Sequence, residues 1–142
     1  MKKKIIYSYS NIKKYEDYQY KGLIGSLMKY DHKMLENNLP KKKYSKVLEI
    51  GPGFHSHINY LNHDYDVYYI IEKEKDKLLF HKKFQNKKIR LSTYKKNKMP
   101  FKKNFFDRII ISHVLEHISN PEKFIEEVMK KYKLDPDKPS PI

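Results

Sequence analysis

Short apolar runs along the chain predict the strands of a parallel sheet. The runs occupy residues 47–50, 66–72 and 109–111, and the last of them is apolar at every position. Consecutive apolar residues are typical of strands that are covered on both faces. The first run leads into a Gly-Pro-Gly sequence at residues 51–53, here called the glycine turn, and the second run ends in Glu72. About twenty residues separate the turn from Glu72, which predicts a strand–helix–strand unit.

Two longer segments have apolar positions at helical spacing. The first is residues 15–38, whose first half is weakened by two glycines and which a proline and three lysines follow. The second is residues 121–132, where Asn120 can cap the helix and Pro121 suits its first position. We interpret the apolar stripe of this second helix as core. The apolar positions are Leu23, Ile24, Leu27, Met28, Met34 and Leu35 in the first helix, and Phe124, Ile125, Val128, Met129 and Tyr132 in the second.

The glycine turn lies where open α/β sheets bind nucleotides or nucleosides. Gly51 and Gly53 lack a Cβ, so the backbone can turn tightly and a ligand can approach it closely. Glu49 puts a carboxylate at the mouth of the turn, which suits a cationic ligand better than a pyrophosphate. Phe54 follows the turn, so the third glycine of a dinucleotide site is absent. The alternative is an ordinary strand followed by a Gly-Pro-Gly loop.

Further motifs occur in the order and at about the spacing of a known family. Residues 99–117 contain the pairs Pro-Phe and Phe-Asp followed by Leu-Glu-His, and residues 120–124 continue the match into the next helix. Together with the glycine turn and Glu72, this segment resembles class I S-adenosylmethionine-dependent methyltransferases of the Leu-Glu-His type. The resemblance implies a Rossmann-like α/β fold with strand order 3-2-1-4, helices on both faces, and S-adenosylmethionine as the cofactor.

The resemblance also implies which residues hold this cofactor. Gly51 and Gly53 would hold the methionine part, with Glu49 nearby. The carboxylate of Glu72 can accept hydrogen bonds from both hydroxyls of the ribose, the role that an acid plays in dinucleotide sites. Methyl transfer is a displacement in which much of the catalysis is the alignment of nucleophile, methyl carbon and sulfur.

Four more positions belong to the predicted site. The family carries an acid just after its third strand that contacts the adenine amine, whereas this chain has Ser92 and Thr93 there. Either one of these two residues replaces the contact, or adenine recognition is weakened. The residues around His113 would line the pocket close to the transferred methyl group. His113 and His117 are candidate general bases, with the alternative that they only shape the loop. No third ligand is evident beside these two histidines, so we expect no metal site.

The chain ends where members of the family continue. After the helix at 121–132 the family has a Lys-Pro-Gly-Gly turn and three further strands, whereas this chain has a short Pro-rich ending. We therefore expect a domain that is truncated after its fourth strand. Its parts would be an N-terminal helical cap at 1–40, an incomplete S-adenosylmethionine-binding core at 41–134 and a Pro-rich tail at 135–142. Residues 109–111 would form an exposed apolar edge, which predicts self-association.

Composition adds two points to this interpretation. The chain of 142 residues contains no cysteine and no segment as long as a signal peptide's apolar region or a membrane span, so we expect a cytoplasmic protein without disulfides. The net charge of +14 is compatible with contact to anionic surfaces. Only Arg90 and Arg108 are arginine among the 31 basic residues, and the lysines are spread along the chain, so we interpret most of them as solvated and disfavour nucleic-acid binding.

Three functions are compatible with these observations. The first is methyl transfer to a small-molecule, sugar or lipid-headgroup acceptor. The second is a ribosomal RNA adenine dimethyltransferase, which Ser-His-Val-Leu at 112–115 disfavours because that family has Asn-Leu-Pro-Tyr or close kin there. The third is a non-catalytic remnant or a cofactor-binding subunit that pairs with another chain through its exposed edge. The sequence does not identify the acceptor.

Overall fold

The computed structural model of the protein describes residues 22–95, 98–112 and 114–133. Its contacts divide the chain into two compact units. The sheet unit comprises residues 41–56 and 63–142, and the helical unit comprises residues 1–40 and 57–62. The predicted Pro-rich tail and most of the predicted helical cap before residue 22 lie outside the described residues, so the predicted division of the chain stays a prediction.

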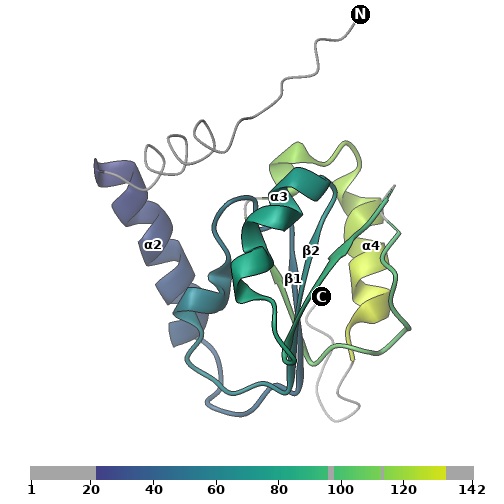
Figure 1. The fold of residues 1–142 in the computed structure, drawn as a ribbon, viewed down its shortest axis with the longest axis horizontal. Coiled ribbons are helices and arrows are strands. Elements are labelled where there is room, and N and C mark those ends of the chain that lie inside the picture. Colours follow the sequence, from purple (N-terminus) through teal and green to yellow (C-terminus); the bar gives the residue numbers. More distant parts are fainter. Residues whose placement is uncertain (1–21, 96–97, 113, 134–142) are drawn as a thin grey trace, which may run out of the picture. The chain divides into compact units, whose positions relative to one another are not determined.

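The sheet unit is built on a parallel four-stranded sheet (Figure 1). Its strands are β1 (Lys46–Ile50), β2 (Val67–Glu72), β3 (Ile89–Thr93) and β4 (Arg108–Ile111), in the spatial order β3-β2-β1-β4. Every pairing is parallel, which brings the carboxyl ends of all four strands to one edge of the sheet. The predicted fold class and the strand order 3-2-1-4 are confirmed.

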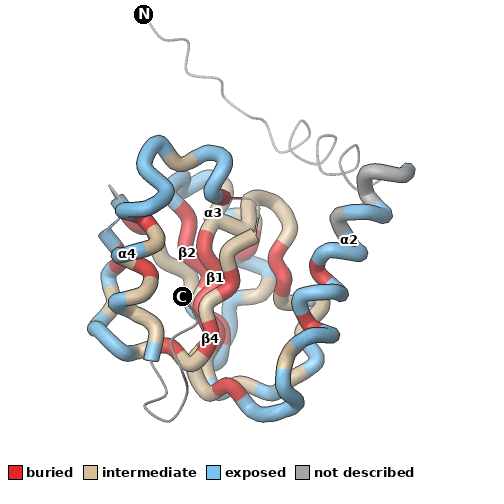
Figure 2. The backbone as a smooth tube through the Cα atoms, turned by 180° about the vertical axis from the view of Figure 1, so that it is seen from behind, coloured by how far each residue is buried: buried red, intermediate tan, exposed pale blue. Residues whose placement is uncertain are grey.

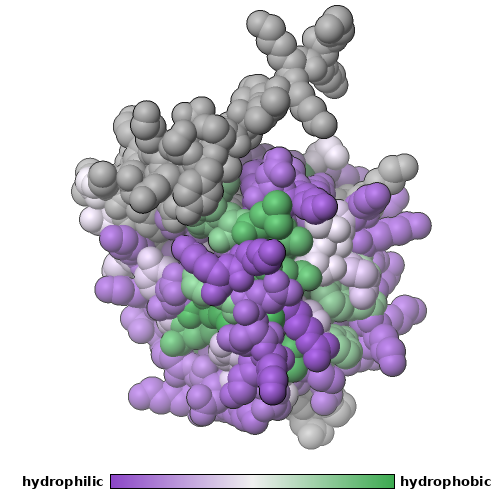
Figure 3. Space-filling model, viewed as in Figure 1, coloured by the Kyte–Doolittle hydropathy of each residue, from purple (hydrophilic) through white to green (hydrophobic). Residues whose placement is uncertain are grey.

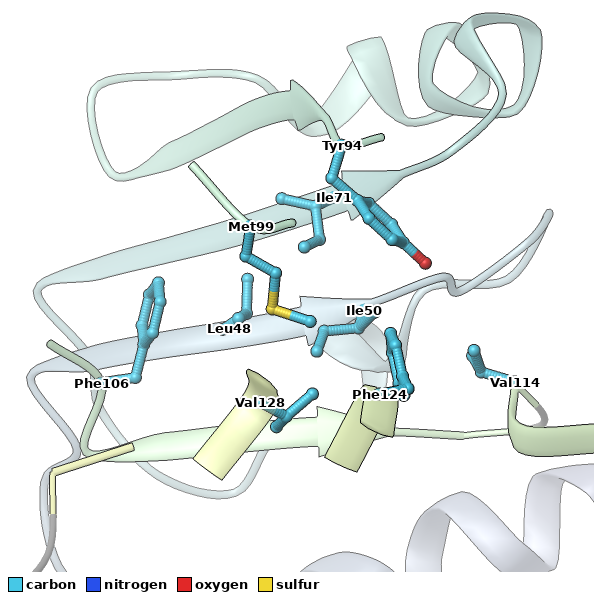
Figure 4. Packing of buried hydrophobic residues seen from close by; sticks show 9 residues of the cluster. All are labelled: Leu48, Ile50, Ile71, Tyr94, Met99, Phe106, Val114, Phe124 and Val128. Atoms are coloured by element: carbon cyan, nitrogen blue, oxygen red, sulfur yellow. The ribbon is translucent and has the colours of Figure 1, made fainter. Parts of the chain in front are cut away.

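The central strand β1 is the most deeply buried element of the sheet. Four of its five residues are buried, and Figure 2 shows the burial along the strand. The side chains of Leu48 and Ile50 point to one face, where they meet the helix α4 (Pro121–Lys131) through Phe124 and Val128 (Figure 4). The whole cluster on this face consists of Leu48, Ile50, Ile71, Tyr94, Met99, Phe106, Val114, Phe124 and Val128.

Helix α4 forms as the sequence predicts. The side chain of Asn120 accepts a hydrogen bond from the backbone N–H of Lys123 (3.1 Å), which satisfies one of the free donors of the first turn. Phe124 and Val128 are buried against the sheet, so the predicted apolar stripe is core. After the helix, Tyr132 forms a parallel bridge with Phe106 at the start of β4. In the spatial order of the described strands β4 comes last, so it is an outer strand of the sheet, as predicted.

The other face of the sheet is covered by α3 (Lys75–Phe80) and the 3-10 turn η2 (His81–Phe84), which follow β2. Helix α3 contacts β2 and β3, and Figure 1 shows α3 and α4 on opposite sides of the strands. The prediction of helices on both faces is thus confirmed. None of the described helices is long and apolar enough to cross a membrane. Hydrophilic side chains cover most of the face shown in Figure 3 and leave smaller hydrophobic areas between them.

The connection between β1 and β2 differs from the predicted strand–helix–strand unit. It contains only the 3-10 turn η1 (His57–Tyr60). The segment contains Asn, Asp and Ser, which favour turns because their side chains compete for backbone hydrogen bonds. The side chain of Ser56 is bound to Glu49, and that of His57 is bound to Glu36. The connection is therefore held by specific side-chain hydrogen bonds and forms no regular α-helix.

The helical unit pairs η1 with α2 (Gly22–Asn37), which forms within the predicted segment 15–38. Among its described side chains, the buried ones are polar: His32 and Glu36 are only 3% and 2% exposed. His57 is hydrogen-bonded to both, at 2.8 Å from His32 and 2.5 Å from Glu36. The apolar positions Leu27, Met34 and Leu35 are exposed, as is Tyr30. The described side chains that α2 buries are therefore a histidine–glutamate network, which the apolar spacing alone did not indicate.

Candidate functional site

The candidate site lies at the carboxyl edge of the sheet, where segments distant in sequence meet. The glycine turn follows β1, Glu72 ends β2, and Thr93 ends β3 in register with Glu72. Ser112 follows β4. Loops at this edge of an open α/β sheet are the usual place for a ligand, because the crevice beside the strand ends is open. The parallel sheet thus brings Gly51, Gly53, Glu72 and Thr93 to one edge.

Gly51 fixes the path of the chain as it leaves β1. Its φ of +61° is a left-handed conformation that residues with a side chain rarely adopt. Its N–H donates to the carbonyl of Ile71 (2.8 Å), which ties the turn to β2. A Cβ at this position would lie 2.9 Å from Cγ2 of Val114, in the loop after β4. Glycine is therefore required both by the backbone conformation and by the close approach of this loop.

Gly53 connects the glycine turn to Glu72. Its φ is +65°, and its N–H donates to Oε1 of Glu72 at 2.5 Å. Among the described residues, apart from its chain neighbours, no heavy atom lies within 4 Å of the place where a Cβ of Gly53 would be. Its carbonyl oxygen is 2.7 Å from Nε2 of His81, the first residue of η2. The open space beside this glycine leaves the backbone of the turn accessible to a ligand.

Glu72 is a buried acid whose side chain is held by the glycine turn. The residue is only 5% exposed, and burial raises its pKa to about 7 despite the opposing effect of the Gly53 N–H. In the described part of the chain, Gly53 is the hydrogen-bond donor to its side chain, through Oε1. Oε2 is therefore available for a second donor. Both oxygens can accept the vicinal hydroxyls of a ribose once the carboxyl group is ionised.

Glu49, predicted near the methionine part of the cofactor, is enclosed by protein. It is 1% exposed, and its Oε2 accepts hydrogen bonds from the hydroxyls of Ser56 (2.5 Å) and Tyr68 (2.9 Å). Burial, followed by the negative charge of Glu49, raises the pKa of Tyr68. The carboxylate therefore holds the segment after the glycine turn against β2.

The predicted adenine contacts lie at the end of β3. Thr93 is exposed and pairs with Glu72 across the sheet, while the hydroxyl of Ser92 donates to the carbonyl of Thr93 (3.3 Å). Tyr94, which follows directly, was not identified from the sequence as a site residue. It is 4% exposed and projects from the end of β3 toward the core (Figure 4). Burial raises its pKa to about 12, and the charge of Glu72 adds to this shift.

The structure describes one of the two predicted catalytic histidines. His113 lies outside the described residues. His117 ends the 3-10 turn η3 (Leu115–His117), is exposed, and lies 4.0 Å from Glu116. No group of three or more metal-binding side chains is gathered in the residues that the structure describes. The roles of both histidines stay predictions.

His81, like Tyr94, was not identified from the sequence as a site residue. It is fully buried, and its contact is with the carbonyl of Gly53, 28 positions earlier in the chain. No motif marks a hydrogen bond from a side chain to a distant backbone carbonyl. Only its position, just after the helix that follows Glu72, could have drawn attention to it.

Solved structures with a similar fold are numerous. An S-adenosylmethionine-dependent methyltransferase from Aquifex aeolicus has 21% identity and a TM-score of 0.67, covering 95% of this chain and 79% of that chain. The YcgJ protein from Bacillus subtilis has 18% identity and a TM-score of 0.65, covering 75% of this chain and 47% of that chain. DhpI, solved in a complex with S-adenosylmethionine and HEP, has 14% identity and a TM-score of 0.65, covering 87% and 56%.

The length of the match differs among these proteins, and the chain spans about half of YcgJ and of DhpI. A search of curated proteins by sequence finds no match. A family model described as a methyltransferase domain matches residues 48–134. The predicted family is thereby confirmed, together with S-adenosylmethionine as the cofactor of that family. The chain belongs to the methyltransferase domain family.

Proposed function

We propose that this chain binds S-adenosylmethionine at the carboxyl edge of its sheet and transfers the methyl group to an acceptor. The acceptor class that we propose is a small molecule, a sugar or a lipid headgroup. The observation that carries the proposal is the link between the glycine turn and Glu72, in which the Gly53 N–H binds one carboxylate oxygen and leaves the other available. This arrangement supports a ligand with a ribose beside an open backbone turn.

Each part of the cofactor has a place at this edge. The backbone at Gly51 and Gly53 takes the methionine part, since no Cβ of Gly53 obstructs an approach. Glu72 takes the ribose hydroxyls. Ser92 and Thr93, in line with Glu72 at the end of β3, are next to the position for the adenine.

The proposed reaction depends mainly on alignment. When bound, S-adenosylmethionine supplies an electrophilic methyl group on a sulfonium, which a nucleophile displaces in line with the leaving sulfur. The rigid strand ends hold the cofactor, and Gly51 packs against Val114, so the loop after β4 is brought beside the methionine position. We propose His113 and His117, at the two ends of this loop region, as the candidate bases for an acceptor hydroxyl or amine.

Calorimetric titration with S-adenosylmethionine and S-adenosylhomocysteine tests the proposal. We expect micromolar binding by the wild type and its loss in Glu72→Ala. The matched control is Glu74→Ala, because Glu74 is in the same loop but its side chain is exposed and forms a surface ion pair with Lys77. Absence of binding by folded wild-type protein would contradict the proposal and favour a non-catalytic remnant. Binding without turnover on any acceptor would instead favour a cofactor-binding subunit.

A further inference from the structure

The peptide groups on both sides of Gly53 are fixed by side chains from different elements. On one side, the N–H of Gly53 donates to Glu72 Oε1 at 2.5 Å. On the other side, the carbonyl oxygen of Gly53 is 2.7 Å from Nε2 of His81. Gly53 has a left-handed φ of +65° and no side chain that could hold it in place. Together with the hydrogen bond from the His55 N–H to the Pro52 carbonyl (3.3 Å), these two contacts orient the end of the glycine turn.

The contact to Gly53 determines the tautomer of His81. A carbonyl oxygen can only accept a hydrogen bond, so Nε2 of His81 carries the proton. Nδ1 is then an acceptor, and it is buried without a hydrogen-bond partner in the described part of the chain. The imidazole lies among aromatic rings, stacked with Phe84 and edge-on to Phe80. A buried polar atom without a partner destabilises the folded protein, so His81 is retained here at a cost in stability.

We propose that His81 is a positioning residue of the cofactor site, which holds the glycine turn so that the Gly53 N–H stays on Glu72. The inference rests on the proposed function, since its consequence is the affinity of Glu72 for the ribose. His81 does not touch the cofactor in this role. It acts through the backbone of Gly53.

A neutral histidine is suited to this position. Burial lowers the pKa of His81; the contact with the Gly53 carbonyl opposes this shift and the charge of Lys83 adds to it, and the net lowering leaves the ring uncharged near neutral pH. A neutral ring donates the required hydrogen bond without placing a positive charge next to a cationic ligand. A lysine or arginine would supply the donor but would repel a sulfonium.

Loss of the His81 contact has a specific consequence for Glu72. The Gly53 N–H stabilises the ionised carboxylate and so lowers the pKa of Glu72, against the raising effect of burial. The other charged groups that act on Glu72 are Lys77, Glu74 and Glu49, and Tyr94 is coupled to it as well. A substitution at residue 81 leaves all of these in place. A turn released from residue 81 therefore raises the titration midpoint of Glu72 through Gly53 alone.

The first test uses the protein without cofactor. The carboxyl carbon of Glu72 is titrated by NMR in the wild type, in His81→Phe and in His81→Gln. Phenylalanine keeps an aromatic ring beside Phe80 and Phe84 but cannot donate, whereas glutamine restores an N–H donor. We expect the midpoint of Glu72 to rise by about one pH unit in His81→Phe and to return toward the wild-type value in His81→Gln. The same midpoint in all three proteins would overturn the inference.

A measurement on the wild type keeps the inference testable if a variant does not fold. The nitrogen chemical shifts of the His81 ring must show a proton on Nε2 and none on Nδ1 at neutral pH. The opposite tautomer would overturn the inference without any substitution, because Gly53 would then lack its donor.

Titration with S-adenosylmethionine separates this inference from the proposed function. We expect the affinity of His81→Phe to fall about fivefold near pH 7, to approach a tenfold loss at lower pH, and to recover above the shifted midpoint of Glu72. A loss that is equal at every pH would show a purely structural role and overturn the inference. If the folded wild type does not bind at all while Glu72 still responds to residue 81, the proposed function fails, and the role of His81 in cofactor binding fails with it.

Discussion

Glu72→Gln should change stability and binding in opposite directions. The folded-state pKa of Glu72 is about 7, above the ordinary value of 4.5, so the folded protein holds a proton that the unfolded chain releases. The stability contribution of this group is therefore highest below pH 4.5 and is lost as the pH rises to about 7. A shift of this size corresponds to about 3 kcal/mol of destabilisation above the folded-state pKa.

A glutamine removes this cost because it is never charged, while its oxygen can still accept the Gly53 N–H. Urea unfolding of wild type and Glu72→Gln at pH 5 and pH 8 measures the effect. We expect the variant to be more stable by up to about 3 kcal/mol at pH 8, with most of this difference absent at pH 5. The control is Glu74→Gln, whose side chain is 61% exposed and which should change stability by less than about 0.5 kcal/mol.

The same glutamine should weaken S-adenosylmethionine binding, since hydrogen bonds to a charged group contribute about 1.5–3 kcal/mol and the amide accepts only through one atom. We expect an affinity loss of about tenfold to a hundredfold. A stability difference that is the same at both pH values would refute the electrostatic reasoning. Unchanged affinity would refute the placement of the ribose.

The remaining predictions concern pH, the glycine turn and the sheet edge. The affinity of the wild type for S-adenosylmethionine should fall about tenfold per pH unit below about pH 7, because Glu72 loses its negative charge when it is protonated. Calorimetric titrations at several pH values test this, and an affinity that does not change with pH would contradict it. Gly51→Ala should lower the free energy of unfolding by about 1–2 kcal/mol because of the left-handed backbone, and by more because of the contact with Val114. Gly53→Ala should show only the loss from the backbone, and equal losses for the two variants in chemical unfolding would contradict this difference. The chain should self-associate through the β4 edge, so the molar mass measured by light scattering should rise with protein concentration. A monomer at high micromolar concentration would count against this prediction.

The parts of the fold that the sequence predicted are those coded by local patterns. The strand β1 and the helix α4 each combine an apolar pattern with a clear boundary residue: Gly51 marks the end of the strand, and Asn120 marks the start of the helix. The strand order followed from the family resemblance and is observed. Glu72 was placed correctly at the end of β2 because a strand that ends in an acid is visible in the sequence.

The parts that the sequence did not predict depend on contacts between distant residues. The burial of His32 and Glu36 on α2 requires His57, whose position depends on the path of the β1–β2 connection. The same holds for His81, whose partner is a backbone carbonyl. Glu49 is likewise enclosed by hydroxyl groups that only the folded sheet brings to it. Local spacing does not specify such polar pairs, since the sequence does not show which distant residue the fold will bring to a given polar side chain.

The most direct test of a cofactor site at the carboxyl edge is a titration of the nitrogen-labelled chain with S-adenosylmethionine, followed by amide NMR. We predict that saturable shifts concentrate at Gly51, Gly53, Glu72 and Thr93, the residues that end or follow β1, β2 and β3. Spectra of a folded protein that do not change, or shifts confined to residues away from these strand ends, would contradict the account.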